Sequence, residues 1–159
     1  MIIFVKAKYI ADCIKNYPRD IKVAVSGDIN LFGGTFDDGS IFIPPPDIVS
    51  RWIDTGDKKR YEEDYLKFLS DPRVFYPLML RVYMASFDPV FFMFSETDEN
   101  HKYPKWLKEF IRDTIGVDVG TFKRFKKNVA YDKPTQDRVN RLLADARLKC
   151  AEAESVYEK

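Results

Sequence analysis

The sequence predicts an α/β protein with a mostly parallel sheet of about four or five strands flanked by helices. Short apolar runs typical of buried strands alternate along the chain with longer segments in which apolar residues recur at helical spacing. This alternation favours parallel strands joined by helices. The chain has 159 residues, of which 45% are hydrophobic and 15% aromatic, which is enough for one well-packed domain. We therefore expect residues 1–159 to form a single domain.

Four apolar runs predict the strands. They cover residues 2–5, 21–25, 90–94 and 117–119. The first run begins at the second residue and lacks the basic lead of a signal peptide. Residues 26–39 are rich in Gly and Asp, which predicts a loop after the second strand.

The segments between these runs predict helices. A short helix carries Ile10 and Ile14 and ends before Pro18. Helix caps are expected at Asp47, Asp57, Asp71 and, for a last helix over about 135–157, at Thr135. Pro77 should kink the helix after Asp71 or delay its start. A further helix is expected at 104–115, with Gly116 as its stop.

The composition limits where the protein works and what it binds. No apolar run approaches the roughly 20 residues that span a bilayer. Cys13 and Cys150 give neither a disulfide framework nor the spacing of a metal site, and Gly33-Gly34 lacks the spacing of a phosphate-binding loop. We expect a soluble, cytoplasmic protein with no metal and no cofactor, and its oligomeric state stays open.

Positive charge is concentrated late in the chain. Residues 101–150 hold 13 Lys and Arg against 6 Asp and Glu, although the net charge of the whole chain is +1. A division of this kind can steer an anionic partner, or it can complement another surface of the same protein.

Polar side chains follow two of the expected strands and form the first candidate site. Ser26 and Asp28 follow the second strand, and Glu96, His101 and Lys102 follow the third. Ligands of parallel α/β sheets bind at the carboxyl ends of the strands, so these residues are candidates for a ligand site. The alternative is that both segments are ordinary polar turns.

His101 and Glu96 are also the candidates for catalysis. His101 is the only histidine, and its side chain ordinarily titrates near neutral pH, as a general base requires. No serine or cysteine nucleophile accompanies it in the sequence. A hydrolase or transferase that uses His101 as general base is therefore the weaker functional alternative. The simplest interpretation is that His101 only opens the next helix.

The basic segment 105–127 is the candidate for a nucleic-acid or host-protein interface. Its cations are Lys105, Lys108, Arg112, Lys123, Arg124, Lys126 and Lys127, and Phe122 and Phe125 lie among them. Lysine and arginine neutralise phosphates, and aromatic rings can stack on unpaired bases. The alternative is a solvated face with both phenylalanines in the core.

Three segments carry a resemblance to a known family. They are Ile43-Pro44-Pro45-Pro46 with the helix to Trp52, Tyr61-Glu62-Glu63-Asp64-Tyr65-Leu66, and Phe94-Ser95-Glu96 followed by His101-Lys102 and Trp106-Leu107. In order and spacing, residues 21–119 resemble the bacterial and phage family catalogued as domain of unknown function 488. The resemblance implies a compact α/β fold with a pocket at the strand ends.

The chain departs from that family where reactivity would be expected. Asn100 stands where the family has the cysteine of a Cys-His-Arg motif, and Lys102 stands for its arginine. The resemblance therefore brings no thiol chemistry, and the family supplies no established reaction. Together these observations predict a phage- or bacterium-encoded accessory protein that binds a small anionic or nucleotide-like ligand.

Overall fold

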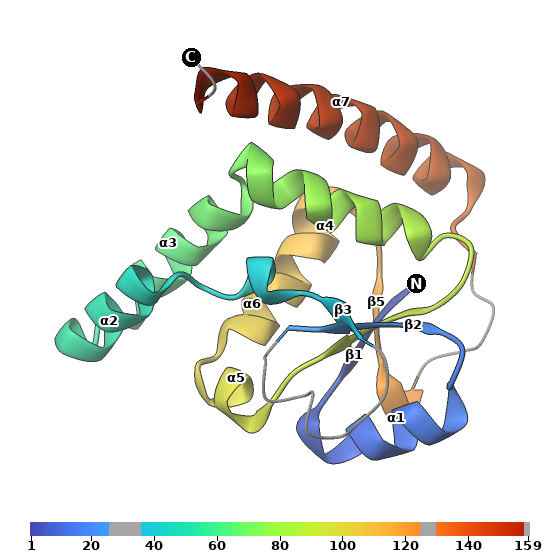
Figure 1. Ribbon diagram of the computed structural model, residues 1–159, viewed down its shortest axis with the longest axis horizontal. Coiled ribbons are helices and arrows are strands. Elements are labelled where there is room, and N and C mark those ends of the chain that lie inside the picture. The colour runs from blue at the N-terminus through green and yellow to red at the C-terminus, as the bar shows by residue number, and fades with distance from the viewer. Residues whose placement is uncertain (26–35, 125–129, 158–159) are drawn as a thin grey trace.

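The computed structural model describes residues 1–25, 36–124 and 130–157 and has the predicted α/β fold. Five strands form one sheet in the order β3-β2-β4-β1-β5, and every pair is parallel. The strands are β1 (Ile2–Val5), β2 (Ile21–Ala24), β3 (Asp37–Asp38), β4 (Val90–Met93) and β5 (Val119–Thr121). The central strands are buried on both faces, as parallel strands usually are (Figure 1).

Two strands differ from the prediction. β5 begins at Val119, which is in register with Ile2, and the predicted Val117 is instead buried in the core before the strand begins. β3 lies in a segment predicted to be a loop, where Asp37 and Asp38 are in register with Val23 and Ala24. Because both side chains are exposed, no apolar pattern in the sequence indicates this strand. Its extended conformation comes from pairing with β2.

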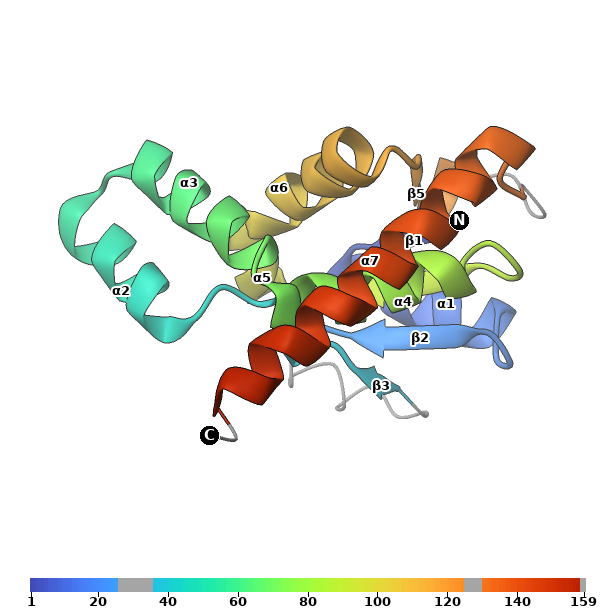
Figure 2. The same cartoon turned by 90° about the horizontal axis from the view of Figure 1, so that it is seen from above.

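The helices cover the two faces unequally. Alternate residues of β1 face opposite sides of the sheet. Ile3 and Val5 pack with helix α1 (Ile10–Asn16), whereas Ile2 and Phe4 belong to the larger core on the other face. That core takes in α3 (Lys58–Leu69), α4 (Pro72–Met84), α6 (Tyr103–Phe110) and α7 (Lys133–Tyr157). Figure 2 shows α7 lying along the outside of α4, so that α4 separates α7 from the sheet.

The remaining turns are short helices. In the described part of the chain they are 3₁₀ turns at Ala7–Tyr9, Ser40–Phe42 and Phe122–Arg124, helix α5 (Glu96–Asn100), and a π turn (Ile111–Ile115) that continues α6. The predicted helix 104–115 is thus α6 plus the π turn, and it stops at Gly116 as expected. Gly116 has φ 81°, a conformation that glycine adopts without strain.

Two predicted caps are confirmed and two are corrected. Asp71 accepts a hydrogen bond from the Arg73 backbone N–H at the start of α4, and Asp57 does the same for Arg60 in α3. Helix α2 (Pro46–Thr55) begins before Asp47, which lies in its first turn. At α7 the cap is Asp132, whose Oδ1 accepts from the Thr135 backbone N–H at 2.9 Å. Pro77 lies inside α4 and does not delay its start.

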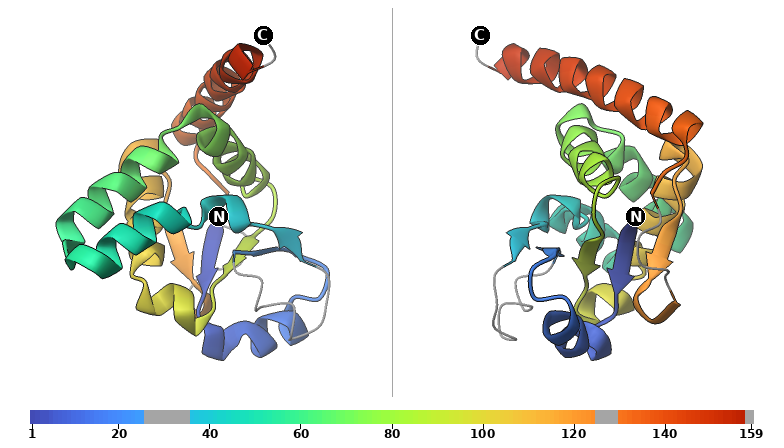
Figure 3. Two further views of the ribbon diagram at one scale, coloured as in Figure 1. Left: turned by 60° about the vertical axis from the view of Figure 1, so that its left-hand side comes forward. Right: turned by 90° about the vertical axis from the view of Figure 1, so that its right-hand side faces the viewer.

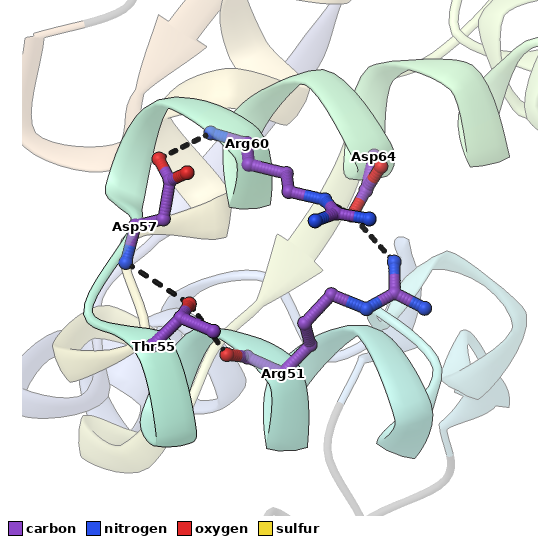
Figure 4. Close-up of polar contacts among 5 residues, drawn as sticks. All are labelled: Arg51, Thr55, Asp57, Arg60 and Asp64. Carbon is purple, nitrogen blue, oxygen red and sulfur yellow. Dashed lines mark hydrogen bonds and ion pairs between the residues drawn. The ribbon is translucent and has the colours of Figure 1, made fainter.

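Helices α2 and α3 form a hairpin that extends to one side of the sheet (Figure 3). Polar contacts tie its two arms together, as Figure 4 shows. Arg51 on α2 and Arg60 on α3 both approach the carboxylate of Asp64, at 3.2 and 3.9 Å. In the turn, Thr55 Oγ1 accepts from the Asp57 N–H at 3.2 Å. The Arg51–Asp64 ion pair thus joins the two helices, whereas the Arg60–Asp64 pair lies within α3.

Candidate functional site

The sheet topology creates a crevice between β1 and β4. The two strands are neighbours, but the chain leaves their carboxyl ends on opposite faces. After β1 it continues into α1 on the smaller core, and after β4 it continues through α5 into α6 on the larger core. Such a switch point in an open parallel sheet is where ligands ordinarily bind.

A cavity of about 320 Å³ lies at this edge of the sheet. Three strand ends and the segment around the start of α6 line it. The lining residues are Phe4, Val5, Lys6, Phe94, Glu99, Lys102, Pro104, Lys105, Lys108 and Thr121. Phe4 and Pro104 supply apolar surface, with Val5 and Phe94 almost fully buried behind it, and four lysines against one glutamate make the polar part basic.

The ammonium groups of the four cavity lysines are not held in ion pairs within the described part of the chain. Lys6, Lys102 and Lys105 are exposed, and Lys108 is half-buried, where its Nζ donates to Thr121 Oγ1 at 3.4 Å. None of the four takes part in an ion pair with another described residue. An anion entering the cavity would therefore not have to break an ion pair in order to reach these ammonium groups.

Lys102 holds an unusual backbone conformation. Its φ is 68°, and no other non-glycine residue among those described has a positive φ. A side chain in this left-handed region costs about 1–2 kcal/mol relative to the right-handed one. Lys102 directly precedes α6, and this conformation turns the chain from α5 into α6 at the wall of the cavity. Backbone strain of this kind is common at functional sites.

Glu99 is the one acid of the cavity. Its side chain is half-buried, and this burial raises the pKa of Glu99, while the ammonium of Lys6 works in the opposite direction. Neighbouring Glu96 raises the pKa further. Glu99 therefore gives up its negative charge at a higher pH than an ordinary glutamate does.

Helix α5 positions Glu99. The sequence predicts a polar turn here, but residues 96–100 are helical. Ser95 Oγ accepts from the Asp98 N–H at 3.3 Å, and Asp98 Oδ2 accepts from the Ser95 N–H at 2.8 Å. This is a capping box, and the spacing of Ser95 and Asp98 was the available signal for a helix start.

The predicted site residues are only partly brought together. Lys102 lines the cavity, whereas Glu96 is exposed and does not. The ring of His101 lies edge-on to Trp52 of α2, with 5.9 Å between centroids, and it is also outside the cavity lining. No hydrogen bond joins the His101 side chain to another described residue. Ser26 and Asp28 lie outside the described residues.

The predicted basic segment is divided. Lys105 and Lys108 line the cavity, and Arg112 is exposed on the π turn. The Nζ of Lys123 lies 4.7 Å from the ring centroid of Tyr9, beyond the end of β5. Lys126 and Lys127 and the side chain of Arg124 are outside the described part of the chain. Phe122 is buried against the α1 face, whereas Phe125 is also not described.

Sequence reasoning missed Lys6 and Glu99 as site residues. Lys6 directly follows the first buried strand, which was a usable signal because the cavity lies at strand ends. Which strand ends meet depends on the strand order, and the sequence does not state it.

Fold and cavity together define the protein as an open parallel α/β protein with a basic pocket at the strand ends. No protein-family model, curated protein or solved structure matches the chain. The resemblance to the domain of unknown function 488 family therefore stays an expectation. No helix among the described residues is both long and apolar enough to cross a membrane. Within the same residues, no group of three or more His, Cys, Asp or Glu side chains is placed to hold a metal ion.

Proposed function

We propose that the protein binds a small anionic, nucleotide-like ligand in the cavity between the ends of β1, β4 and β5. The observation that carries this proposal is the combination of four lysines with an apolar floor at the switch point of the sheet. The anionic group lies among Lys6, Lys102, Lys105 and Lys108. The body of the ligand packs on Phe4 and Pro104.

Size and chemistry support this ligand class. A volume of about 320 Å³ is at the lower end of the range for small-molecule pockets, which are mostly apolar with a few polar groups that fix orientation. Lysine ammoniums bind phosphate as point charges. The apolar floor favours a ligand with a flat or apolar body over a bare inorganic anion.

Calorimetric titration with thymidine 5′-monophosphate, with uncharged thymidine for comparison, tests the proposal. The paired variant Lys102→Gln, Lys105→Gln should weaken monophosphate binding about tenfold or more, since it removes two of the four cations. The matched control is Lys58→Gln, Lys59→Gln, which removes the same charge from exposed positions on α3. Equal affinity of the pocket variant and the wild type, or equal binding of thymidine and its monophosphate, would sink the proposal.

Glu99 should make anion binding depend on pH. Benzenesulfonate is the probe because its own charge does not change. As the pH falls, Glu99 takes up a proton at a higher pH than an ordinary glutamate does, and the affinity for the anion should rise about two- to fivefold as the repulsion is lost. The charged groups around it are Lys6, Lys8, Lys102, Lys105, Lys108, Glu96 and Asp98.

The control for this pH effect is Glu99→Gln. This variant should bind benzenesulfonate more tightly than the wild type at neutral pH and lose the dependence on pH, because the lysines stay charged throughout the range. A variant with the same pH profile as the wild type would show that another group is responsible.

Lys102→Gly separates binding from stability. Glycine adopts φ 68° without strain, so the free energy of unfolding should rise by about 0.5–1 kcal/mol. The same variant should bind thymidine monophosphate more weakly, because a cation of the cavity is gone. Chemical denaturation and calorimetry on one preparation measure both. A loss of stability would contradict strain at Lys102, and unchanged affinity would contradict a role of its side chain in binding.

A further inference from the structure

A second basic group lies beside the cavity. The Nζ atoms of Lys8 and Lys123 lie 5.0 and 4.7 Å from the centroid of the Tyr9 ring. Lys8 follows β1 and Lys123 follows β5, and these strands are neighbours in the sheet. The ring attracts each ammonium, but two like charges on one ring also repel each other. An anion bound close to both ammonium groups would offset that repulsion.

The two basic groups border each other. Lys6 lines the cavity and Lys8 follows it by two residues, and the charges of both act on Glu99. The cations along this edge are Lys6, Lys8, Lys102, Lys105, Lys108 and Lys123. None of the six is in an ion pair with a described residue, although elsewhere Arg51, Arg73 and Arg81 have carboxylate partners. This basic edge, as we call these six lysines, runs from the cavity to Tyr9.

We propose that the occupant of the cavity is the terminal nucleotide of a single-stranded nucleic acid, whose next phosphates lie along the basic edge at Lys8 and Lys123. This inference rests on the proposed function. Six lysines exceed what one small anion can neutralise, whereas a strand supplies a phosphate at every nucleotide. The apolar floor at Phe4 and Pro104 then takes the base or sugar of the terminal nucleotide.

The shape of the site favours a single strand over other polyanions. In a duplex the bases are stacked and paired, so placing a base in the cavity costs unstacking and unpairing energy that a single strand does not have to supply. Inorganic polyphosphate would match the lysines but leave the apolar floor without a partner. The aromatic residues near the lysines are typical of single-strand binding, where rings and cations act together.

The test compares thymidine 5′-monophosphate, oligothymidylate of eight nucleotides and inorganic polyphosphate of similar charge in one calorimetric series. The octamer should bind at least tenfold more tightly than the monophosphate, and its affinity should fall more steeply with salt. Lys8→Gln, Lys123→Gln should weaken octamer binding about tenfold and leave monophosphate binding within about twofold. Lys102→Gln, Lys105→Gln should weaken both ligands. The control is Lys58→Gln, Lys59→Gln, and circular dichroism establishes that each variant is folded.

The outcomes separate the two proposals. An octamer that binds no more tightly than the monophosphate, or equally in the Lys8, Lys123 variant, overturns the inference and leaves the small-ligand proposal standing. Polyphosphate binding as tight as octamer binding overturns a nucleic-acid strand as the occupant. Octamer binding that survives Lys102→Gln, Lys105→Gln while monophosphate binding is absent overturns the proposed function itself.

Discussion

Replacement of Phe92 by alanine is expected to lower the free energy of unfolding by about 3–5 kcal/mol. Phe92 is fully buried on β4, a central strand of the sheet. Its ring stacks with Phe4 of β1 at 5.8 Å and with Phe42 of the 3₁₀ turn at 5.7 Å. Alanine leaves a cavity between these two rings, and surrounding strands held by hydrogen bonds close such a cavity only in part.

Urea denaturation followed by circular dichroism measures this loss. The matched control is Phe87→Ala, because Phe87 is 70% exposed in the turn before β4, where its ring contacts Tyr83. Its loss should change stability by no more than about 0.5 kcal/mol. Equal effects of the two substitutions would contradict a core centred on the stacked phenylalanines.

Two tyrosines of α3 should respond oppositely to the same chemical change. The hydroxyl of Tyr65 donates to the Phe42 carbonyl oxygen at 2.7 Å inside the core. Tyr65→Phe leaves that carbonyl without its donor and should cost about 1–3 kcal/mol. The hydroxyl of Tyr61 is equally buried but has no partner among the described residues, and burial raises the pKa of Tyr61 to about 12.

Tyr61→Phe should therefore be neutral or stabilising, since it removes a polar atom that gains nothing from burial. Both variants keep the ring, so the stacking of Tyr61 on Trp52 at 4.7 Å is retained. Denaturation midpoints of the two variants, measured together, give the comparison. A larger loss for Tyr61→Phe than for Tyr65→Phe would show that the hydrogen bond to Phe42 does not carry the difference.

The strands that the sequence predicted well are those whose own side chains are buried. Residues 2–5 and 90–93 are apolar throughout and residues 21–24 are apolar except for Lys22, as expected for strands covered on both faces, so their position can be recognised locally. β3 could not be recognised in this way, because Asp37 and Asp38 are exposed and are a strand only through pairing with β2. The two-residue shift of β5 has the same cause, since its register with β1 is a long-range choice.

Helix starts show where local chemistry is enough. Asp57 and Asp71 cap their helices as expected, because a cap is a contact between residues two or three positions apart. The same rule applies to Ser95 and Asp98, but the helix that they begin has only five residues, too few for a helical pattern of apolar residues to show it. His101 itself drew attention as the only histidine, but its packing against Trp52 of the hairpin is a tertiary contact.

The sequence by itself determined the α/β class, the buried strands and the concentration of lysines after residue 100, because these depend on residue type and local spacing. Only the tertiary structure decided that β1 lies between β4 and β5. That order places Lys6 with Glu99, Lys102 and Thr121 around one cavity, although more than 90 positions separate Lys6 from the others. It also brings Lys8 and Lys123 to one tyrosine ring. Strand order follows from how whole helices and strands pack, and no local pattern encodes it.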